Sequence, residues 1–114
     1  MRIQHALFEC CGVKLAEAQT KSRANRLAIA RHGLSYFLWR RYRLSTVEIG
    51  RLLNRDHSTI CHSLGLAEAS VEGHKSPKCQ AIAALIRNLN DAEDTALSHH
   101  NRPKEEAALL TGNR

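Results

Sequence analysis

A chain of 114 residues has the size of a single domain, which excludes a nucleotide-hydrolysing module and a recognition module side by side. Lysine and arginine number 17 against 11 acidic residues, and the formal charge of +6 makes an anionic partner the first class to consider. Nine of the cationic residues fall between positions 21 and 55 beside one glutamate, so we expect one local basic face.

Apolar residues recur with helical spacing from the first residues onward, and strand alternation is nearly absent. The first expected helix carries an apolar stripe from Ile3 to Cys10 and ends at Gly12, which suits a left-handed C-terminal position. A short helical turn over residues 15–19 follows. The polar and cationic residues 20–25 then form a loop.

A long helix is expected over residues 26–42, because its apolar residues form one core-facing stripe. Arginines crowd the end of this helix, where cations suit the negative end of the helix dipole. Trp39 lies beside the stripe, and we interpret it as a core or boundary residue. The stripe itself consists of Leu27, Ala30, Leu34, Phe37 and Leu38.

Two short helices come next, joined by almost no connecting chain. Ser45 to Glu48 has the S-x-x-E spacing of a capping box, so a helix begins at Thr46, and Asn54, which tolerates positive φ, ends it. Asp56 is a suitable N-cap for the following helix. Helices joined so tightly must cross at a steep angle, which predicts a helix-turn-helix. The apolar side of the second helix is formed by Ile60, Leu64, Ala67 and Val71.

A final helix opens with Ser76 as N-cap and Pro77 as its first residue. Beyond Asn90 the sequence becomes polar, and we expect a largely disordered segment in which EEAALL becomes helical only on contact. The chain therefore divides into a helix-turn-helix domain over residues 1–90 and a polar tail over residues 91–114. The fold class is all-α, a small helical bundle. Its last apolar stripe is Cys79, Ile82, Ile86 and Leu89.

The run NRDHSTICH, at the junction of the two motif helices, gathers many short hydrogen-bonding side chains. In a helix-turn-helix the beginning of the second helix enters the major groove, and short side chains allow close approach to base edges. Asp56 can accept from the N4 amino group of cytosine, and His57 and Ser58 can donate or accept at base edges. Arg55 and Thr59 are placed to hold phosphates. Capping alone would also explain Asp56, and a solvated first turn would explain Ser58 and Thr59.

The longer run LSTVEIGRLLNRDHSTICHSL resembles the signature of the C-terminal DNA-binding domain of the bacterial replication initiator DnaA. That domain is a Trp-repressor-like helix-turn-helix whose pattern is approximately LS-x-x-EIG-x-x-x-G-G-RDH-T-T-V-x-H. Upstream, KSRANRLAIAR occupies the place of its basic loop and the head of its long helix. The resemblance covers about residues 6–90 and implies the same fold and binding to double-stranded DNA.

The resemblance also implies roles for individual residues. Asp56, His57 and Ser58 match the positions that read bases in the major groove. Arg55 matches the arginine of the motif, and Arg31 falls where the family has a phosphate-contacting arginine near the start of its long helix. Positions that lie toward the DNA backbone in the family are occupied by Thr46, Thr59 and His62.

Departures from the family pattern bear on this implied site. The two-glycine turn of the family is replaced by Asn54 alone, so the crossing of the two helices is expected to differ. The arginine that the family inserts into the minor groove falls at Asn25, and we expect Arg23 or Arg26 to reach the DNA instead. The ATPase domain of the family is not encoded in these residues, so we do not expect origin melting.

Other functions compete with DNA binding. A zinc site could be drawn from His57, Cys61 or His62 and Cys79, but no second ligand pair has a spacing of two to four residues. An enzyme would need Asp56, His57 and Ser58 to act as a catalytic set. Neighbouring residues on one helix turn point about 100° apart, so these side chains cannot adopt the geometry of an acid that orients a base facing a nucleophile. We therefore expect no enzyme activity, no cofactor and no metal. The remaining alternative is a small basic helical adaptor that binds an acidic replication or transcription protein, with DNA contact secondary.

We predict a sequence-specific DNA-binding regulator of transcription or replication that reads the major groove with the helix beginning near Asp56. The four cysteines include no CxxC pair and no charged-then-apolar leader is present, so we expect a reducing cytoplasm and association with the nucleoid. No apolar run approaches the roughly 20 residues that a membrane-spanning helix needs. We therefore expect no membrane partner.

Overall fold

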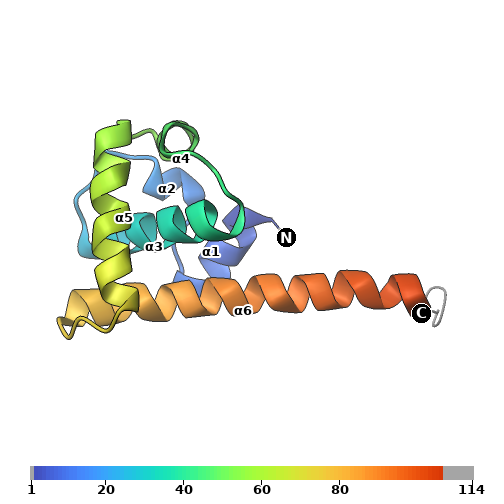
Figure 1. The fold of residues 1–114 in the computed structure, drawn as a ribbon. Coiled ribbons are helices and arrows are strands. Elements are labelled where there is room, and N and C mark those ends of the chain that lie inside the picture. Colours follow the sequence, from blue (N-terminus) through green and yellow to red (C-terminus); the bar gives the residue numbers. More distant parts are fainter. Residues whose placement is uncertain (1, 107–114) are drawn as a thin grey trace.

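The computed structural model describes residues 2–106, with side chains through Leu97, and over this range the chain is all-α, as predicted (Figure 1). None of the helices in this range is long and apolar enough to span a membrane. In chain order the helices are α1 (Ile3–Cys11), α2 (Leu15–Ala18), α3 (Asn25–Arg41), α4 (Thr46–Leu53), α5 (His57–Val71) and α6 (Pro77–Glu106).

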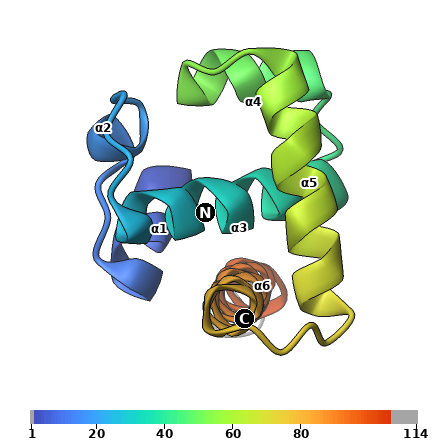
Figure 2. The ribbon, with the colours of Figure 1, turned by 90° about the vertical axis from the view of Figure 1, so that its left-hand side faces the viewer.

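The long helix α3 is the centre of the molecule. Figure 2 shows α4 above it, α5 along one side, α6 below, and α1 and α2 on the remaining side, and α3 contacts each of them. This enclosure buries the predicted α3 stripe completely, because each neighbouring helix covers part of its surface. The buried stripe is Leu27, Ala30, Leu34, Phe37 and Leu38.

Helices α4 and α5 form the predicted helix-turn-helix. The capping box is present, since the hydroxyl of Ser45 accepts from the amide of Glu48 and the Glu48 carboxylate accepts from the amide of Ser45. Asn54 ends α4 in the left-handed conformation with φ 57°. The amide of Arg55 then donates to the carbonyl of Gly50 at 2.7 Å, which closes a Schellman motif.

The turn brings the backbone of Arg55 very close to α4. A Cβ atom added at Gly50 would lie 2.5 Å from the carbonyl oxygen of Arg55, a distance that no side chain tolerates. Gly50 therefore permits the short connection between the two helices. In the resembled family, the turn itself contains two glycines where this chain has Asn54. The two helices lie across one another, and the beginning of α5 projects at the edge of the molecule (Figure 1).

The buried side of α5 differs from the predicted one at its end. Ile60, Leu64 and Ala67 are buried as predicted, but Val71 is 47 % exposed. The buried face includes serines instead, because a small hydroxyl fits the close packing of α5 on α3 and α6 and satisfies its own hydrogen bond. The Ser63 hydroxyl lies 2.8 Å from Nδ1 of His32 on α3, and the Ser70 hydroxyl donates to the carbonyl of Leu66.

The last helix begins as predicted at Pro77, with the Ser76 hydroxyl accepting from the amide of Cys79. The prediction of disorder from residue 91 is wrong over residues 91–106, where α6 continues (Figure 1). Contacts hold the first turn of this continuation: Arg41 donates to Asn90 and pairs with Asp94 at 3.0 Å, and the Tyr42 hydroxyl donates to Glu93. The end of the predicted EEAALL contact helix lies outside the described residues.

Candidate nucleic-acid interface

The beginning of α5 forms an exposed turn that is capped by hydrogen bonds. Asp56 caps the helix, since its carboxylate accepts from the amide of Ser58 at 3.2 Å and from the Ser58 hydroxyl. These hydrogen bonds hold the pKa of Asp56 below its ordinary value, so the carboxylate is ionised at neutral pH. His57, Ser58 and Thr59 are exposed beside it, and His62 is exposed one turn further along. The turn therefore presents fixed acceptors and free imidazoles to solvent.

Arg55 is less free than its neighbours. It is half-buried, and its guanidinium donates to the carbonyls of Leu53, Asn54 and Thr20. The bond to Thr20 connects the helix-turn-helix to the loop that follows α2. Arg55 therefore contributes to the position of the α5 tip through contacts within the chain.

Arg31, for which the resemblance implies a contact with a DNA phosphate, lies largely inside the molecule. The residue is 8 % exposed, and its guanidinium donates to the carbonyls of Ala18, Thr20 and Ser22 at 2.8 Å each. Burial lowers the pKa of Arg31, and the nearby cation of Arg55 lowers it further. Three of the five guanidinium N–H donors are taken up by these carbonyls, so Arg31 fixes the loop.

The loop held by Arg31 carries exposed cations. Lys21 and Arg23 are exposed on it, and Arg26 is exposed in the first turn of α3, where it pairs with Glu17 at 3.0 Å. An exposed ion pair of this kind is worth little, so Arg26 can exchange its partner for another anion. Asn25, the position of the missing arginine, is the first residue of α3 and is exposed between Arg23 and Arg26.

A groove of about 670 Å³ joins these parts into one surface. Sequence reasoning missed Lys21, Val47 and Arg51, which line it. A signal was present for the last two, because Val47 and Arg51 lie off the buried stripe of α4 and must point outward; both are exposed. Thr46, at the head of α4, is half-buried. The groove is lined by Lys21, Val47, Gly50, Arg51, Asn54, Arg55, Asp56 and His57.

The hydrogen bonds of this surface are those of a helix cap. The Asp56 carboxylate is bonded to Ser58, and no hydrogen bond joins it to the His57 ring. Of the four residues considered for a zinc site, Cys79 is buried, whereas His57, Cys61 and His62 are exposed. Within the described part of the chain, no group of three His, Cys, Asp or Glu residues could hold a metal ion.

Two crossed helices with a tight turn and an exposed second-helix tip define the class of helix-turn-helix proteins. Residues 1–65 match the family described as the bacterial dnaA protein helix-turn-helix, and the chain belongs to this family. Domains of this family are the DNA-binding domains of replication initiators. The resemblance inferred from the RDHSTICH run is thereby confirmed.

Two full-length relatives are named as initiators. The chain is 30 % identical over 99 residues to the chromosomal replication initiator protein DnaA of Thermomicrobium roseum. It is 32 % identical over 90 residues to the chromosomal replication initiator protein DnaA 1 of Chlamydia pneumoniae. These matches cover 86 % and 79 % of this chain, but it spans only about a fifth of the length of each relative, 21 % and 20 %. No solved structure matches the chain significantly.

Proposed function

We propose that this protein binds double-stranded DNA sequence-specifically, with the first turn of α5 in the major groove. The observation that carries the proposal is the exposed, capped tip of α5 beside a groove with cationic walls. This tip is free in the described chain, since Asp56, His57, Ser58 and Thr59 are all exposed. Base edges in the major groove differ in their donors and acceptors, which a set of short polar side chains can distinguish.

Each residue of the tip has a chemical role in this proposal. The ionised Asp56 keeps acceptor capacity for the N4 amino group of cytosine, and capping fixes its direction. The Ser58 hydroxyl donates to Asp56, so its lone pairs accept from a base. His57, the first residue of α5, reaches base edges with a ring nitrogen.

Phosphate contacts surround this reading surface. Thr59 and His62 face the backbone from α5, and Thr46 does so from the head of α4. Arg23 takes the place of the minor-groove arginine that is absent at Asn25, and Arg26 joins it after releasing Glu17. Arg55 and Arg31 support these contacts indirectly, because both hold the loop that carries the cations. The additional cations of the groove are Lys21 and Arg51.

A domain of this kind acts by occupying DNA, by recruiting another protein or by excluding one. The two relatives are named as replication initiators, so we propose control of replication or transcription at initiator-type sites on the nucleoid. No catalytic step is part of this proposal.

The test is a selection of bound duplexes from a random pool, followed by salt titration on the selected and a scrambled duplex. The proposal expects a short consensus, a steep fall of affinity with salt on both duplexes, and an affinity offset of about a thousandfold or more between them. Absence of a consensus together with equal affinities would contradict it.

A further inference from the structure

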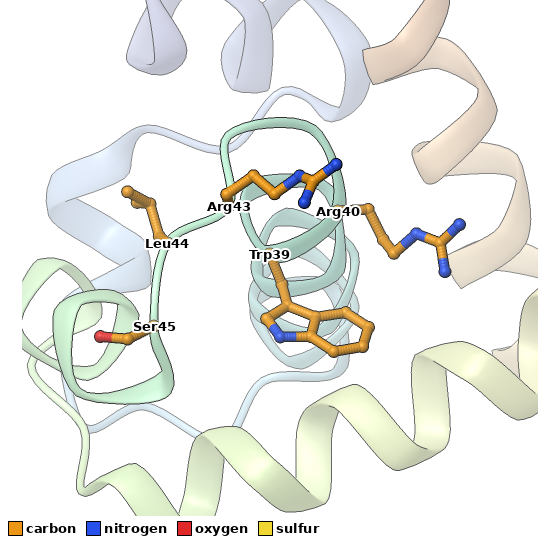
Figure 3. A pocket seen from close by; sticks show the side chains of 5 residues that line it. All are labelled: Trp39, Arg40, Arg43, Leu44 and Ser45. Atoms are coloured by element: carbon orange, nitrogen blue, oxygen red, sulfur yellow. The ribbon is translucent and has the colours of Figure 1, made fainter.

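A second surface lies at the far end of α3. It is a pocket of about 550 Å³ lined by Trp39, Arg40, Arg43, Leu44 and Ser45 (Figure 3). The basic loop of the proposed DNA surface precedes the first residue of α3, whereas the pocket lies at its last turn and on the segment that follows. A helix of 17 residues is about 25 Å long, so α3 separates the pocket from the basic loop, while Ser45 of the pocket is next to Thr46 at the head of α4.

The pocket carries cations that lack acidic partners. Arg40 and Arg43 are exposed, and within residues 2–97 neither pairs with a carboxylate. Their neighbour Arg41 differs, because it is already paired with Asp94. No acidic residue lines the pocket. Arg43 has φ 56°, a left-handed conformation that is costly for arginine. A local positive charge is therefore placed here without a partner in the described chain.

Aromatic packing gives the pocket an apolar, preorganised wall. Trp39 is 36 % exposed and packs on Tyr36 with ring centroids 6.1 Å apart. The guanidinium of Arg40 lies 6.0 Å from the centroid of the same Tyr36 ring, which restrains its conformation. Leu44 adds a half-buried apolar side chain on the segment that leads to α4 (Figure 3). Tryptophan and arginine are enriched among the hot-spot residues that contribute most of the binding free energy in protein interfaces.

We propose that this pocket, the Trp39 pocket, binds an acidic segment of a partner protein. An apolar side chain of the segment packs on Trp39, and flanking carboxylates pair with Arg40 and Arg43. Charge complementarity selects the occupant, since both cations lack partners and no acid lines the pocket. A phosphodiester backbone would use the cations but leave the apolar wall without a partner, so a peptide is favoured over DNA.

Trp39 is the single tryptophan of the chain, so its fluorescence reports on this pocket directly. The probes are acetylated and amidated pentapeptides EDXDE in which X is leucine, phenylalanine or glycine, titrated into the 114-residue chain. The proposal expects a saturable emission change with leucine or phenylalanine and affinity weaker by about tenfold with glycine.

Arg40→Ala and Arg43→Ala should each weaken binding of the apolar peptides by about tenfold. Arg87→Ala, which removes an exposed cation on α6, is the matched control and should change nothing.

Two outcomes would overturn the proposal. One is that no peptide binds saturably, or that the glycine peptide binds as tightly as the apolar peptides and every variant binds them as tightly as the wild type. The other is a Trp39 response to the selected DNA duplex with DNA affinity reduced in Arg40→Ala and Arg43→Ala but not in Arg87→Ala. That second outcome would assign the pocket to the DNA surface. Thermal melting of each variant checks that its fold is retained.

Discussion

At the scale of single residues, Arg31 has a structural role within the chain, which differs from the role of the residues proposed to contact DNA. Its guanidinium donates to the carbonyls of Ala18, Thr20 and Ser22, and removing it leaves the Ala18 and Ser22 carbonyls without a charged donor, while Thr20 keeps its bond to Arg55. We expect Arg31→Ala to lower the free energy of unfolding by about 2–4 kcal/mol in urea denaturation. Arg31→Lys should not restore it, because a compact ammonium cannot span three carbonyls.

Arg23 supplies the matched control for Arg31. It is exposed on the same loop, so Arg23→Ala should leave the unfolding free energy unchanged. It should instead weaken binding to all duplexes and reduce the slope of log affinity against log salt by about one unit. Unchanged stability in Arg31→Ala would show that this arginine does not hold the loop.

At the scale of elements, the turn between α4 and α5 depends on a glycine. Gly50→Ala would place a Cβ atom 2.5 Å from the carbonyl oxygen of Arg55, so the turn must shift. We expect a loss of about 1–3 kcal/mol in unfolding free energy and weaker binding to the selected duplex. Gly65→Ala on α5 is the control: a Cβ atom there has open space, and stability should rise by up to about 1 kcal/mol. Equal effects of both substitutions would contradict the tight turn.

The packing of α5 on α3 includes a half-buried histidine, His32. Burial, followed by the charges of Lys78, His62 and Arg31, lowers the pKa of His32 to about 4, and the ring is bonded to Ser63. The unfolded chain, with an ordinary pKa of 6.5, binds this proton first as pH falls. Stability is therefore unaffected by His32 above about pH 6.5 and decreases as the pH falls from there toward 4.

His32→Gln removes this titration, and the variant should show a smaller decrease of melting temperature between pH 6.5 and 4 than the wild type. His5→Gln, at an exposed position on α1, should keep the wild-type dependence. Melting curves at several pH values measure both. An identical pH dependence in His32→Gln and wild type would mean that the imidazole is not held neutral in the folded chain.

The elements that the sequence predicted well are those determined by local chemistry. The capping box at Ser45, the left-handed Asn54 and the Asp56 cap all depend on residues within one turn, and all three are present. The burial of Arg31 was not predicted although a signal existed, since it lies four residues after Leu27 and three before Leu34, within the buried stripe. Its inward orientation depends on carbonyls of a loop, which helical periodicity does not describe.

At the scale of the whole molecule, the continuation of α6 was not predictable from periodicity. The predicted apolar stripe ends at Leu89, whereas in the structure Ala92 also packs against the core, and Arg41 and Tyr42 from a distant part of the chain contact the same turn. The same holds for the groove, because Lys21 and Arg51 come together only when the loop after α2 folds beside α4. Long-range contacts therefore limited the sequence prediction more than local structure did.

The division of the chain at residue 90 stays a prediction with a direct test. Truncation after Asn90 removes Glu93 and Asp94 but no residue of the proposed DNA surface. We expect affinity for the selected duplex to stay within about twofold, with unfolding free energy reduced by roughly 1 kcal/mol, as for other partly exposed pairs. Gel-shift titration and urea denaturation measure these quantities. Loss of DNA binding by the folded truncated chain would show that the domain extends beyond residue 90.

The central claim is that the tip of α5 reads bases, and His57→Ala tests it most directly. Binding of wild type and variant is measured on the selected duplex and on random-sequence DNA, with His74→Ala, at an exposed position before α6, as the control. We expect His57→Ala to lose about 1–3 kcal/mol of binding free energy on the selected duplex and almost nothing on random DNA. An equal loss on both, or no loss on either, would contradict base reading by this helix.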